Sequence, residues 1–232
     1  MKLSIIIPVY NENATVLEIL KKIESIQNIQ KQIIIVDDGS NDGSYQLISS
    51  FNFISEHKII RHDFNSGKGS CIKSAQNYIS GDIVIIQDAD LEYDPNDYND
   101  IIKAIYKNKK KVVYGSRVLN KTRYDQKNFI SNFRIFANHI LTLLTNFLFL
   151  QNLTDAHTCY KAFDSKVFKE INLKENDFAF CPEITAKVSK LGHKIFEVPI
   201  SYFGRNYNEG KKISFYDGIR AILVLLKYRI FY

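Results

Sequence analysis

The chain has 232 residues, of which 45% are hydrophobic and 24% charged, and these values exclude disordered, collagen-like and low-complexity classes. Its three cysteines form no CxxC pair, which excludes a disulfide framework and a thiolate zinc site. Residues 1–100 carry 8 basic and 15 acidic side chains, whereas residues 101–232 carry 23 basic and 10 acidic ones. This asymmetry argues against a nucleic-acid-binding stripe. It suits a metal on one side and phosphates or an anionic membrane on the other, unless both halves are simply solvated surface.

Apolar runs and helical periodicities alternate over the first 115 residues. The apolar runs predict strands, and the segments between them predict helices, the first of which is expected to open with a capping box at Thr15 and Glu18. A strand, loop and helix repeated four times indicate a parallel sheet of βαβ units. The expected strands are 3–9, 32–36, 58–62, 82–87 and 111–115, and the expected helices are 16–26, 44–51, one ending near 78, and 96–107.

The second half is less regular. Apolar residues at helical spacing over 128–150 predict a helix, which is either an ordinary core helix or an amphipathic helix on a membrane surface. A further helix is expected over 177–191 and a strand over 195–202. The tail 214–232 is too short to span a bilayer but can lie at an interface. No window of about 18 uninterrupted apolar residues occurs, so we expect no membrane-spanning helix.

Polar side chains gather where the predicted strands end. In parallel sheets ligands bind at this edge, which predicts an active site there. Asp and Asn are also common in turns and helix caps, and this could explain the polar residues of one loop, but it explains those of four loops less well. The residues concerned are Asn11, Glu12, Asp37, Asp38, Gly67 to Gly69, Asp88 and Asp90.

The Asp88-Ala-Asp90 turn is the strongest local signal. Two carboxylates on a turn that leaves a buried strand can converge on one hard cation, and Mg²⁺ or Mn²⁺ takes such ligands together with substrate phosphates. Glu92 either adds a contact or is solvated.

The first loop argues against a dinucleotide-dependent enzyme. It reads Pro8-Val-Tyr-Asn-Glu12 and lacks the GxGxxG pattern, and Gly67-Lys-Gly69 lacks the spacing of a Walker A loop. Tyr10, Glu12 and Asp38 instead offer a ring face and carboxylate acceptors, which suit a nucleobase and a ribose.

The segments IIIPVYNE, IIVDDGSNDGS, NSGKG, IIQDADLEYDP and YGSR resemble the inverting family 2 glycosyltransferases of the GT-A fold. TDAHTCYKAF, FAFCPEITAKVSKLGHKIFEVPISYFGR and NEGKKISFYDGIRAILVLLKYR resemble one branch, the polyprenyl-phosphate glycosyltransferases, of which dolichyl-phosphate mannose synthase is a member. The resemblance covers nearly the whole chain. It implies an α/β, GT-A-like domain with a mostly parallel central sheet and a helical C-terminal part.

The resemblance also implies roles for individual residues. The nucleotide would be bound by Pro8, Tyr10, Glu12, Asp38, Lys68 and Asp88. The cation would be held by Asp88, Asp90 and Glu92, and the catalytic groups would be Asp90, Arg117 and Arg205. The acceptor phosphate would be bound by Arg134, Lys211 and Lys212.

Two departures from the branch stand out. Many members carry Gly where Cys159 stands, and many continue into transmembrane helices, so we expect a peripheral protein or one that relies on an anchoring partner or a homo-oligomer. The acceptor decides what further chemistry is required. A phosphate is ionised near pH 7 and requires no base, whereas a hydroxyl requires one. Asp155 and Glu183 are the candidate bases, although each can equally be a helix cap or the buried partner of an arginine. His157 is a candidate acceptor or donor contact.

These observations lead us to expect a GT-A domain over residues 1–204 and a basic loop with a membrane-facing helix over 205–232. The expected reaction is metal-dependent transfer of a mannose- or glucose-type hexose from GDP-mannose or UDP-glucose to a dolichyl or undecaprenyl phosphate. We expect it to proceed with inversion at the cytoplasmic face of the membrane, without a nucleic-acid partner. The alternatives are transfer to a glycan or lipopolysaccharide hydroxyl, and a catalytically silent nucleotide-sugar-binding protein.

Overall fold

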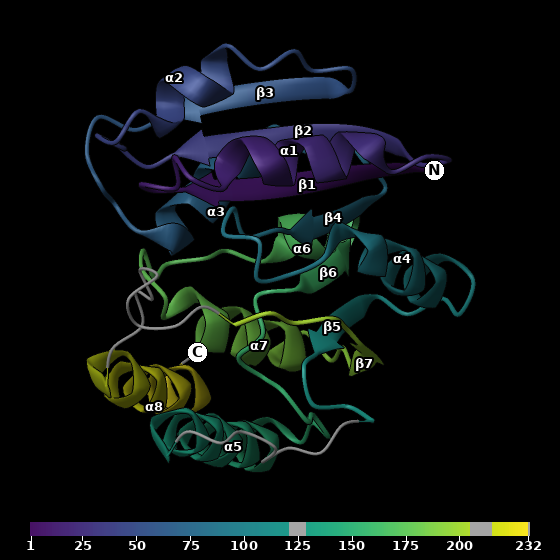
Figure 1. Ribbon diagram of the computed structural model, residues 1–232. Coiled ribbons are helices and arrows are strands. Elements are labelled where there is room, and N and C mark those ends of the chain that lie inside the picture. The colour runs from purple at the N-terminus through teal and green to yellow at the C-terminus, as the bar shows by residue number, and fades with distance from the viewer. Residues whose placement is uncertain (121–128, 205–214, 232) are drawn as a thin grey trace.

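A seven-stranded sheet forms the centre of the protein, as seen in the computed structural model (Figure 1), which describes residues 1–120, 129–204 and 215–231. The strand order is β3-β2-β1-β4-β6-β5-β7, and only β6 runs antiparallel to its neighbours. The strands are β1 (Lys2–Val9), β2 (Gln30–Asp37), β3 (Glu56–Arg61), β4 (Ile83–Ile86), β5 (Val112–Ser116), β6 (Lys161–Asp164) and β7 (Ile195–Pro199). The α/β class and the mostly parallel sheet are therefore confirmed.

Helices cover both faces of the sheet. One face packs on α1 (Val16–Ser25), α2 (Ser44–Ser49) and α4 (Tyr98–Tyr106), with the 3₁₀ turn η1 (Pro95–Asp97) before α4. The other face packs on α3 (Lys68–Gln76), α6 (Ser165–Glu170) and α7 (Phe180–Lys190). Buried isoleucines alternate along β1, with Ile5 and Ile7 on the first face and Ile6 on the second. Such continuous apolar strands are typical of a sheet covered on both sides.

Two long helices form a third layer outside α7. They are α5 (Phe129–Phe149) and α8 (Phe215–Ile230), and they lie side by side at the bottom of Figure 1. A separate apolar cluster joins them to α7 through Phe149, Ala186, Leu225 and Tyr228. The helix expected over 128–150 and the helical tail are therefore confirmed. The domain boundary expected after residue 204 meets the border of the described residues and stays a prediction.

Three details differ from expectation. The capping box at Thr15 is wrong, because the Thr15 hydroxyl donates to a side-chain oxygen of Glu12 at 3.2 Å and makes no capping bond to α1. The strand β6 and the helix α6 were not expected. As a result β5 pairs with β6 and β7, and β6 separates it from β4.

Candidate active site

The carboxyl ends of β2, β1 and β4 lie next to one another, as the parallel sheet predicts. Tyr10 and Glu12 follow β1, Asp38 follows β2, and Asp88 and Asp90 follow β4. The sheet therefore brings the predicted nucleotide and metal residues to one edge. The carboxyl end of β5, which carries Arg117, lies on the far side of β6.

The loop after β1 is held in place by the loop after β2. The backbone of Asn11 has φ of 52° and donates to Ser40 Oγ at 3.0 Å, and the backbone of Glu12 donates to Ser44 Oγ at 2.9 Å. Pro8 belongs to β1 and pairs with Val36. The Tyr10 ring, half-buried at this edge, remains a candidate for contact with a nucleobase.

Asp38 has a different environment from the one expected. Its buried carboxylate accepts hydrogen bonds from the backbones of Ser66 (3.0 Å) and Gly67 (2.7 Å) and from His62 Nδ1 (2.6 Å). These donors belong to the segment that leads into α3. Asp38 therefore organises the NSGKG loop, and most of its acceptor capacity is used within the protein.

His62 belongs to a hydrogen-bonded chain as well. Its second ring nitrogen lies 2.9 Å from Ser74 Oγ. Asp38, His62 and Cys71 are also the one group of three potential metal ligands, among the residues that the structure describes, whose donor atoms lie within 4.8 Å of one another. Because Asp38 is already bonded to His62 and to the loop backbone, these contacts account for the cluster.

Asp88 and Asp90 offer carboxylate oxygens at the end of β4, where the sequence predicts a divalent cation. The carboxylate of Asp90 accepts the backbone N–H of Glu92 at 3.2 Å, which shapes the turn. The Glu92 carboxylate accepts the Tyr202 hydroxyl at 3.0 Å and does not form a three-ligand group with the two aspartates. The hard oxygen donors of Asp88 and Asp90 fit Mg²⁺ or Mn²⁺.

A positive charge already lies at Asp88. The ammonium of Lys68 bonds to Asp88 Oδ1 and also contacts Cys159 Sγ at 3.1 Å. Burial alone would lower the pKa of Lys68, but the Asp88 carboxylate raises it well above its usual value. The position is therefore one at which a cation is stable, which supports the fit of a metal there.

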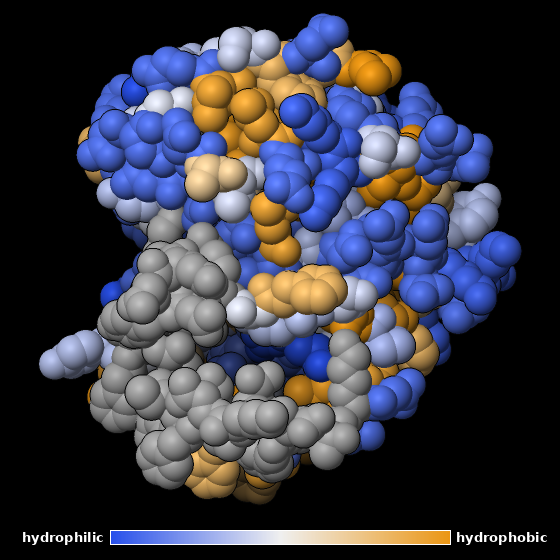
Figure 2. Space-filling view, in the orientation of Figure 1, coloured by the Kyte–Doolittle hydropathy of each residue, from blue (hydrophilic) through white to orange (hydrophobic). Residues whose placement is uncertain are grey.

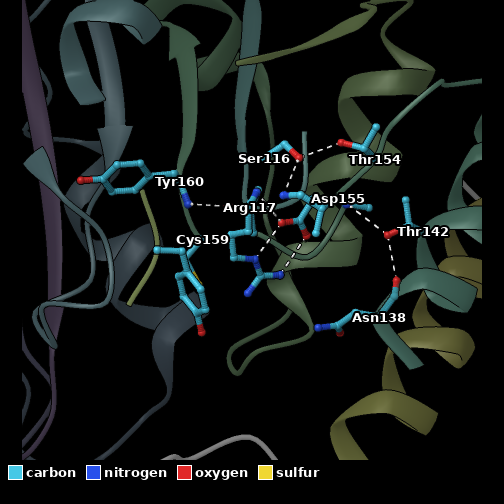
Figure 3. Close-up of polar contacts among 12 residues, drawn as sticks. Ser116, Arg117, Asn138, Thr142, Thr154, Asp155, Cys159 and Tyr160 are labelled. Atoms are coloured by element: carbon cyan, nitrogen blue, oxygen red, sulfur yellow. Dashed lines mark hydrogen bonds and ion pairs between the residues drawn. The ribbon is translucent and has the colours of Figure 1, made fainter. Parts of the chain in front are cut away.

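Arg117 is held by Asp155 in a bidentate ion pair (Figure 3). Its Nε lies 2.7 Å from Asp155 Oδ2 and its Nη2 lies 2.8 Å from Oδ1, while its backbone N–H donates at 3.1 Å. The guanidinium also lies 5.1 Å from the centre of the Tyr202 ring. Burial raises the pKa of Asp155, but the charge and hydrogen bonds of Arg117 outweigh it and hold the pKa below the usual value. Asp155 is thus the buried partner of an arginine, one of the two alternatives considered.

Glu197 supports this pair and was not predicted. Its carboxylate accepts the backbone N–H groups of Thr154 (2.7 Å) and Asp155 (2.9 Å) and the Thr154 hydroxyl (2.9 Å). A carboxylate inside the apolar run that forms β7 was the signal that could have identified it. It connects β7 to the turn that presents Asp155.

Glu183 is also structural. Fully buried in α7, it accepts the backbone N–H groups of Lys174 and Glu175, the ammonium of Lys187 and the Tyr228 hydroxyl, at 2.6–2.8 Å. Both candidate bases therefore have their carboxylate oxygens bonded within the protein.

A second buried lysine lies beneath the site. Lys161 in β6 is fully buried, donates to the Ala156 carbonyl at 2.8 Å and lies 3.7 Å from the centre of the Tyr114 ring. Burial lowers its pKa to about 8. Burial, together with the nearby Lys161 charge, also lowers the pKa of His157 to about 4, so this imidazole is neutral at pH 7.

Two cysteines meet at the same place. The thiols of Cys159 and Cys181 hydrogen-bond to each other, which lowers the pKa of Cys181 to about 7 and raises that of Cys159. The spacing of the three cysteines gave no indication of this contact. The predicted acceptor-phosphate and catalytic residues Arg205, Lys211 and Lys212 lie outside the described residues, and so does the side chain of Arg134, which belongs to α5.

Comparisons with known proteins agree with this architecture. A family model described as Glycosyl transferase family 2 matches residues 4–172. The chain is 26% identical over 235 residues to the dolichol-phosphate mannosyltransferase of Pyrococcus furiosus, covering 98% of this chain and 64% of that protein, which is therefore longer. It is 29% identical over 249 residues to the UDP-N-acetylglucosamine–dolichyl-phosphate N-acetylglucosaminyltransferase of Methanococcus voltae, covering 98% of this chain and 92% of that protein.

A solved structure shows the same fold. Glucosyl-3-phosphoglycerate synthase from Mycobacterium tuberculosis, in complex with Mn²⁺, uridine diphosphate and glucosyl-3-phosphoglycerate, superposes with a TM-score of 0.70 at 16% identity. The match covers 98% of this chain and 79% of that one.

Proposed function

Because the chain belongs to glycosyl transferase family 2, we propose that it transfers a hexose from a nucleotide-diphosphate sugar to a polyprenyl phosphate, with inversion and with Mg²⁺ or Mn²⁺. The sugar is of mannose or glucose type and the nucleotide is GDP or UDP. Two relatives support this assignment, because the names of the proteins from Pyrococcus furiosus and Methanococcus voltae specify dolichol phosphate or dolichyl phosphate.

We choose a phosphate acceptor over a hydroxyl because both candidate bases already form hydrogen bonds within the protein. Asp155 is paired with Arg117 and Glu183 is bonded to four donors, so neither is available to remove a proton from a hydroxyl. A phosphate acceptor is ionised near pH 7 and requires no base. The arrangement therefore favours an anionic nucleophile.

Electrostatic stabilisation then carries the reaction. Asp88 and Asp90 would hold a divalent cation, whose charge would offset the negative charge that develops on the leaving diphosphate. Arg117 adds a fixed guanidinium whose orientation Asp155 sets. The remaining cations of the proposal are Arg134, Arg205, Lys211 and Lys212, which bind donor and acceptor phosphates.

The outer helices suit a peripheral position at a membrane. No stretch of the described helices combines the length and the hydropathy that spanning a bilayer requires. However, α5 exposes Phe147 at 80% and Leu143 at 50%, and α8 exposes Leu223 at 60%. Figure 2 shows hydrophobic residues at the lower edge of the molecule, over α5. Arg220 and Lys227 on α8 pair with Glu175, and Arg220 also with Asp177, whereas Arg229 is exposed near the end of α8. This layer would dock the protein on the anionic cytoplasmic face mainly through its exposed apolar side chains, with Arg229 adding positive charge.

The acceptor is tested with radiolabelled donors. The purified chain is incubated with UDP-glucose or GDP-mannose, Mg²⁺ or Mn²⁺, and dolichyl or undecaprenyl phosphate. Label in an organic-soluble, acid-labile product supports the proposal. Label only in a glycan acceptor would favour the hydroxyl alternative, and donor binding without any transfer would indicate a silent binding protein.

The cation is tested at Asp90. Asp90→Ala is expected to abolish cation-dependent transfer, whereas Asp100→Ala, an exposed aspartate of α4, keeps it. Full activity of Asp90→Ala would remove the metal assignment.

Membrane docking is tested by liposome flotation. The double variant Leu143→Ser, Phe147→Ser should float less well than wild type with anionic liposomes. Ile54→Ser, which removes a side chain exposed at 86% far from α5, should float like wild type. Equal flotation of all three proteins would contradict docking through α5.

A further inference from the structure

Lys68 lies in a closed environment that is built for a cation. Its ammonium contacts Asp88 Oδ1 and Cys159 Sγ, and it lies 5.9 Å from the centre of each of the Phe178 and Phe180 rings. The side chains of Lys68 and Asp88 are only 10% and 13% exposed. A largely buried ion pair beside two aromatic rings is a specific arrangement, since either charge would be costly to bury without its partner.

The backbone directs Lys68 into this environment. Gly67 has φ of 95°, and a Cβ on it would meet the Asn176 carbonyl oxygen at 2.5 Å. The loop can therefore turn sharply against the 175–177 segment, and α3 begins at Lys68. Asp38, which binds the backbone of Ser66 and Gly67, fixes the same turn.

Lys68 and a divalent cation would compete for Asp88. A cation that binds Asp88 repels the ammonium and takes its carboxylate partner. The ammonium would then be buried without a counter-charge, which is strongly unfavourable. A nucleotide diphosphate at the same strand edge would remove this penalty, because its oxygens can accept the ammonium at the end of the flexible lysine side chain.

We propose that Lys68 holds Asp88 in the absence of ligands and passes to the donor diphosphate when the cation binds. This inference rests on the proposed cation site at Asp88 and goes beyond it. Lys68 makes cation binding weak without nucleotide and strong with it, so the two ligands bind with positive coupling. By linkage, the cation strengthens nucleotide binding by the same factor.

The test measures Mn²⁺ binding directly, by electron paramagnetic resonance of free Mn²⁺, with the full chain. The Kd for Mn²⁺ is determined without nucleotide and with saturating UDP or GDP, whichever binds more tightly. Lys68→Met removes the competing charge and keeps most of the length of the side chain. Without nucleotide, it should bind Mn²⁺ more tightly than wild type by roughly 5- to 150-fold, the usual range of coupling between sites. The ratio of the two Kd values should shrink by a similar factor.

Lys73→Met is the matched control. Lys73 lies on the same helix but bonds to the side chain of Asn176 and the Lys174 carbonyl, away from Asp88. It should give the wild-type Kd values. Lys68→Gln serves as a second variant, so that a folding defect in Lys68→Met leaves the inference testable.

The outcomes separate the inference from the proposed function. If wild type binds Mn²⁺ with nucleotide but both Lys68 variants show the wild-type Kd without it, the competition is refuted and the metal site stands. If wild type binds no Mn²⁺ with or without either nucleotide, the proposed metal site fails and the inference fails with it.

Discussion

The ion pair between Arg117 and Asp155 provides the sharpest test of the site. Asp155→Asn keeps the size of the side chain and one acceptor oxygen but removes the charge. It also places an amide NH₂ group where an oxygen accepts from Arg117, since both carboxylate oxygens are used, at 2.7 and 2.8 Å. The variant therefore leaves a buried guanidinium without a counter-charge.

The expected loss of stability follows from the burial of the pair. The side chains of Arg117 and Asp155 are only 18% and 6% exposed. Removing one partner of a buried pair costs about 3–5 kcal/mol, and the remaining acceptor oxygen places Asp155→Asn near about 3 kcal/mol. In a protein of this size, that loss corresponds to a decrease in Tm of roughly 6–12 °C.

The assay is urea unfolding followed by circular dichroism at pH 7, with thermal unfolding as a check. Glu18→Gln is the matched control, because Glu18 forms an exposed ion pair with Lys22 on α1. This control should lose no more than about 0.5 kcal/mol. The double variant Arg117→Met, Asp155→Leu should recover much of the loss, since it removes both charges of the pair and leaves neither without its partner.

The pH dependence adds a second criterion. The pKa of Asp155 is lowered in the folded protein from a reference value of 3.8, so its contribution is present above that value and is lost as the pH falls through the folded pKa. The difference between wild type and Asp155→Asn should therefore narrow below about pH 4. A variant as stable as wild type at pH 7, with only its kcat reduced, would refute the structural role and restore Asp155 as a candidate base.

Three further predictions concern other buried positions. Lys161→Met should flatten the pH dependence of stability. Burial lowers the pKa of Lys161 from 10.5 to about 8, so the wild-type protein becomes more stable as the pH rises between those values. Urea unfolding at pH 7–10 measures this slope, and the same slope in the variant would contradict the prediction. Glu183→Gln should lower the free energy of unfolding by about 3 kcal/mol and speed hydrogen exchange in α8, because the Glu183 carboxylate accepts a hydrogen bond from Tyr228. Unchanged exchange in α8 would count against this link. Gly67→Ala should destabilise the protein by about 1–3 kcal/mol in thermal unfolding, because Gly67 has a positive φ. Gly218→Ala, near the start of α8, should stabilise it by about 0.5–1 kcal/mol, because an added Cβ meets nothing within 4 Å there. Equal effects of the two substitutions would refute the strain at Gly67.

Most strands and helices could be predicted because their signals are local. The apolar run 3–9 and the periodicity of 128–150 each follow from the chemistry of consecutive residues. β6 escaped prediction for the same reason. It is only four residues long, begins with a charged lysine, and exists because its neighbours β4 and β5 pair with it. Pairing between distant segments is not encoded in a local period.

In the candidate site, too, features encoded by neighbouring residues were predictable and contacts between distant segments were not. The position of Asp88 and Asp90 at a strand end was predictable, because strand order in a parallel sheet determines that edge. The engagement of Asp38 was not, since its donors Ser66 and Gly67 lie 28 and 29 residues further along the chain. Lys161 and Glu197 are charged residues in apolar runs, and this was the available sign that each is buried with specific partners.

The antiparallel strand β6 separates the two parts of the candidate site. β6 starts between the end of β4 and the end of β5, and Gly115 donates its N–H to the Tyr160 carbonyl at 2.8 Å just beyond the last paired residues. The strands that lead to Asp88 and Arg117, β4 and β5, are therefore two strand spacings apart, about 10 Å. The segment 155–160, which leads into β6, therefore lies between the part of the candidate site that contains Asp88 and the part that contains Arg117. Under the proposed function, lengthening or shortening this segment would change the size of the sugar phosphate that Asp88 and Arg117 could both contact.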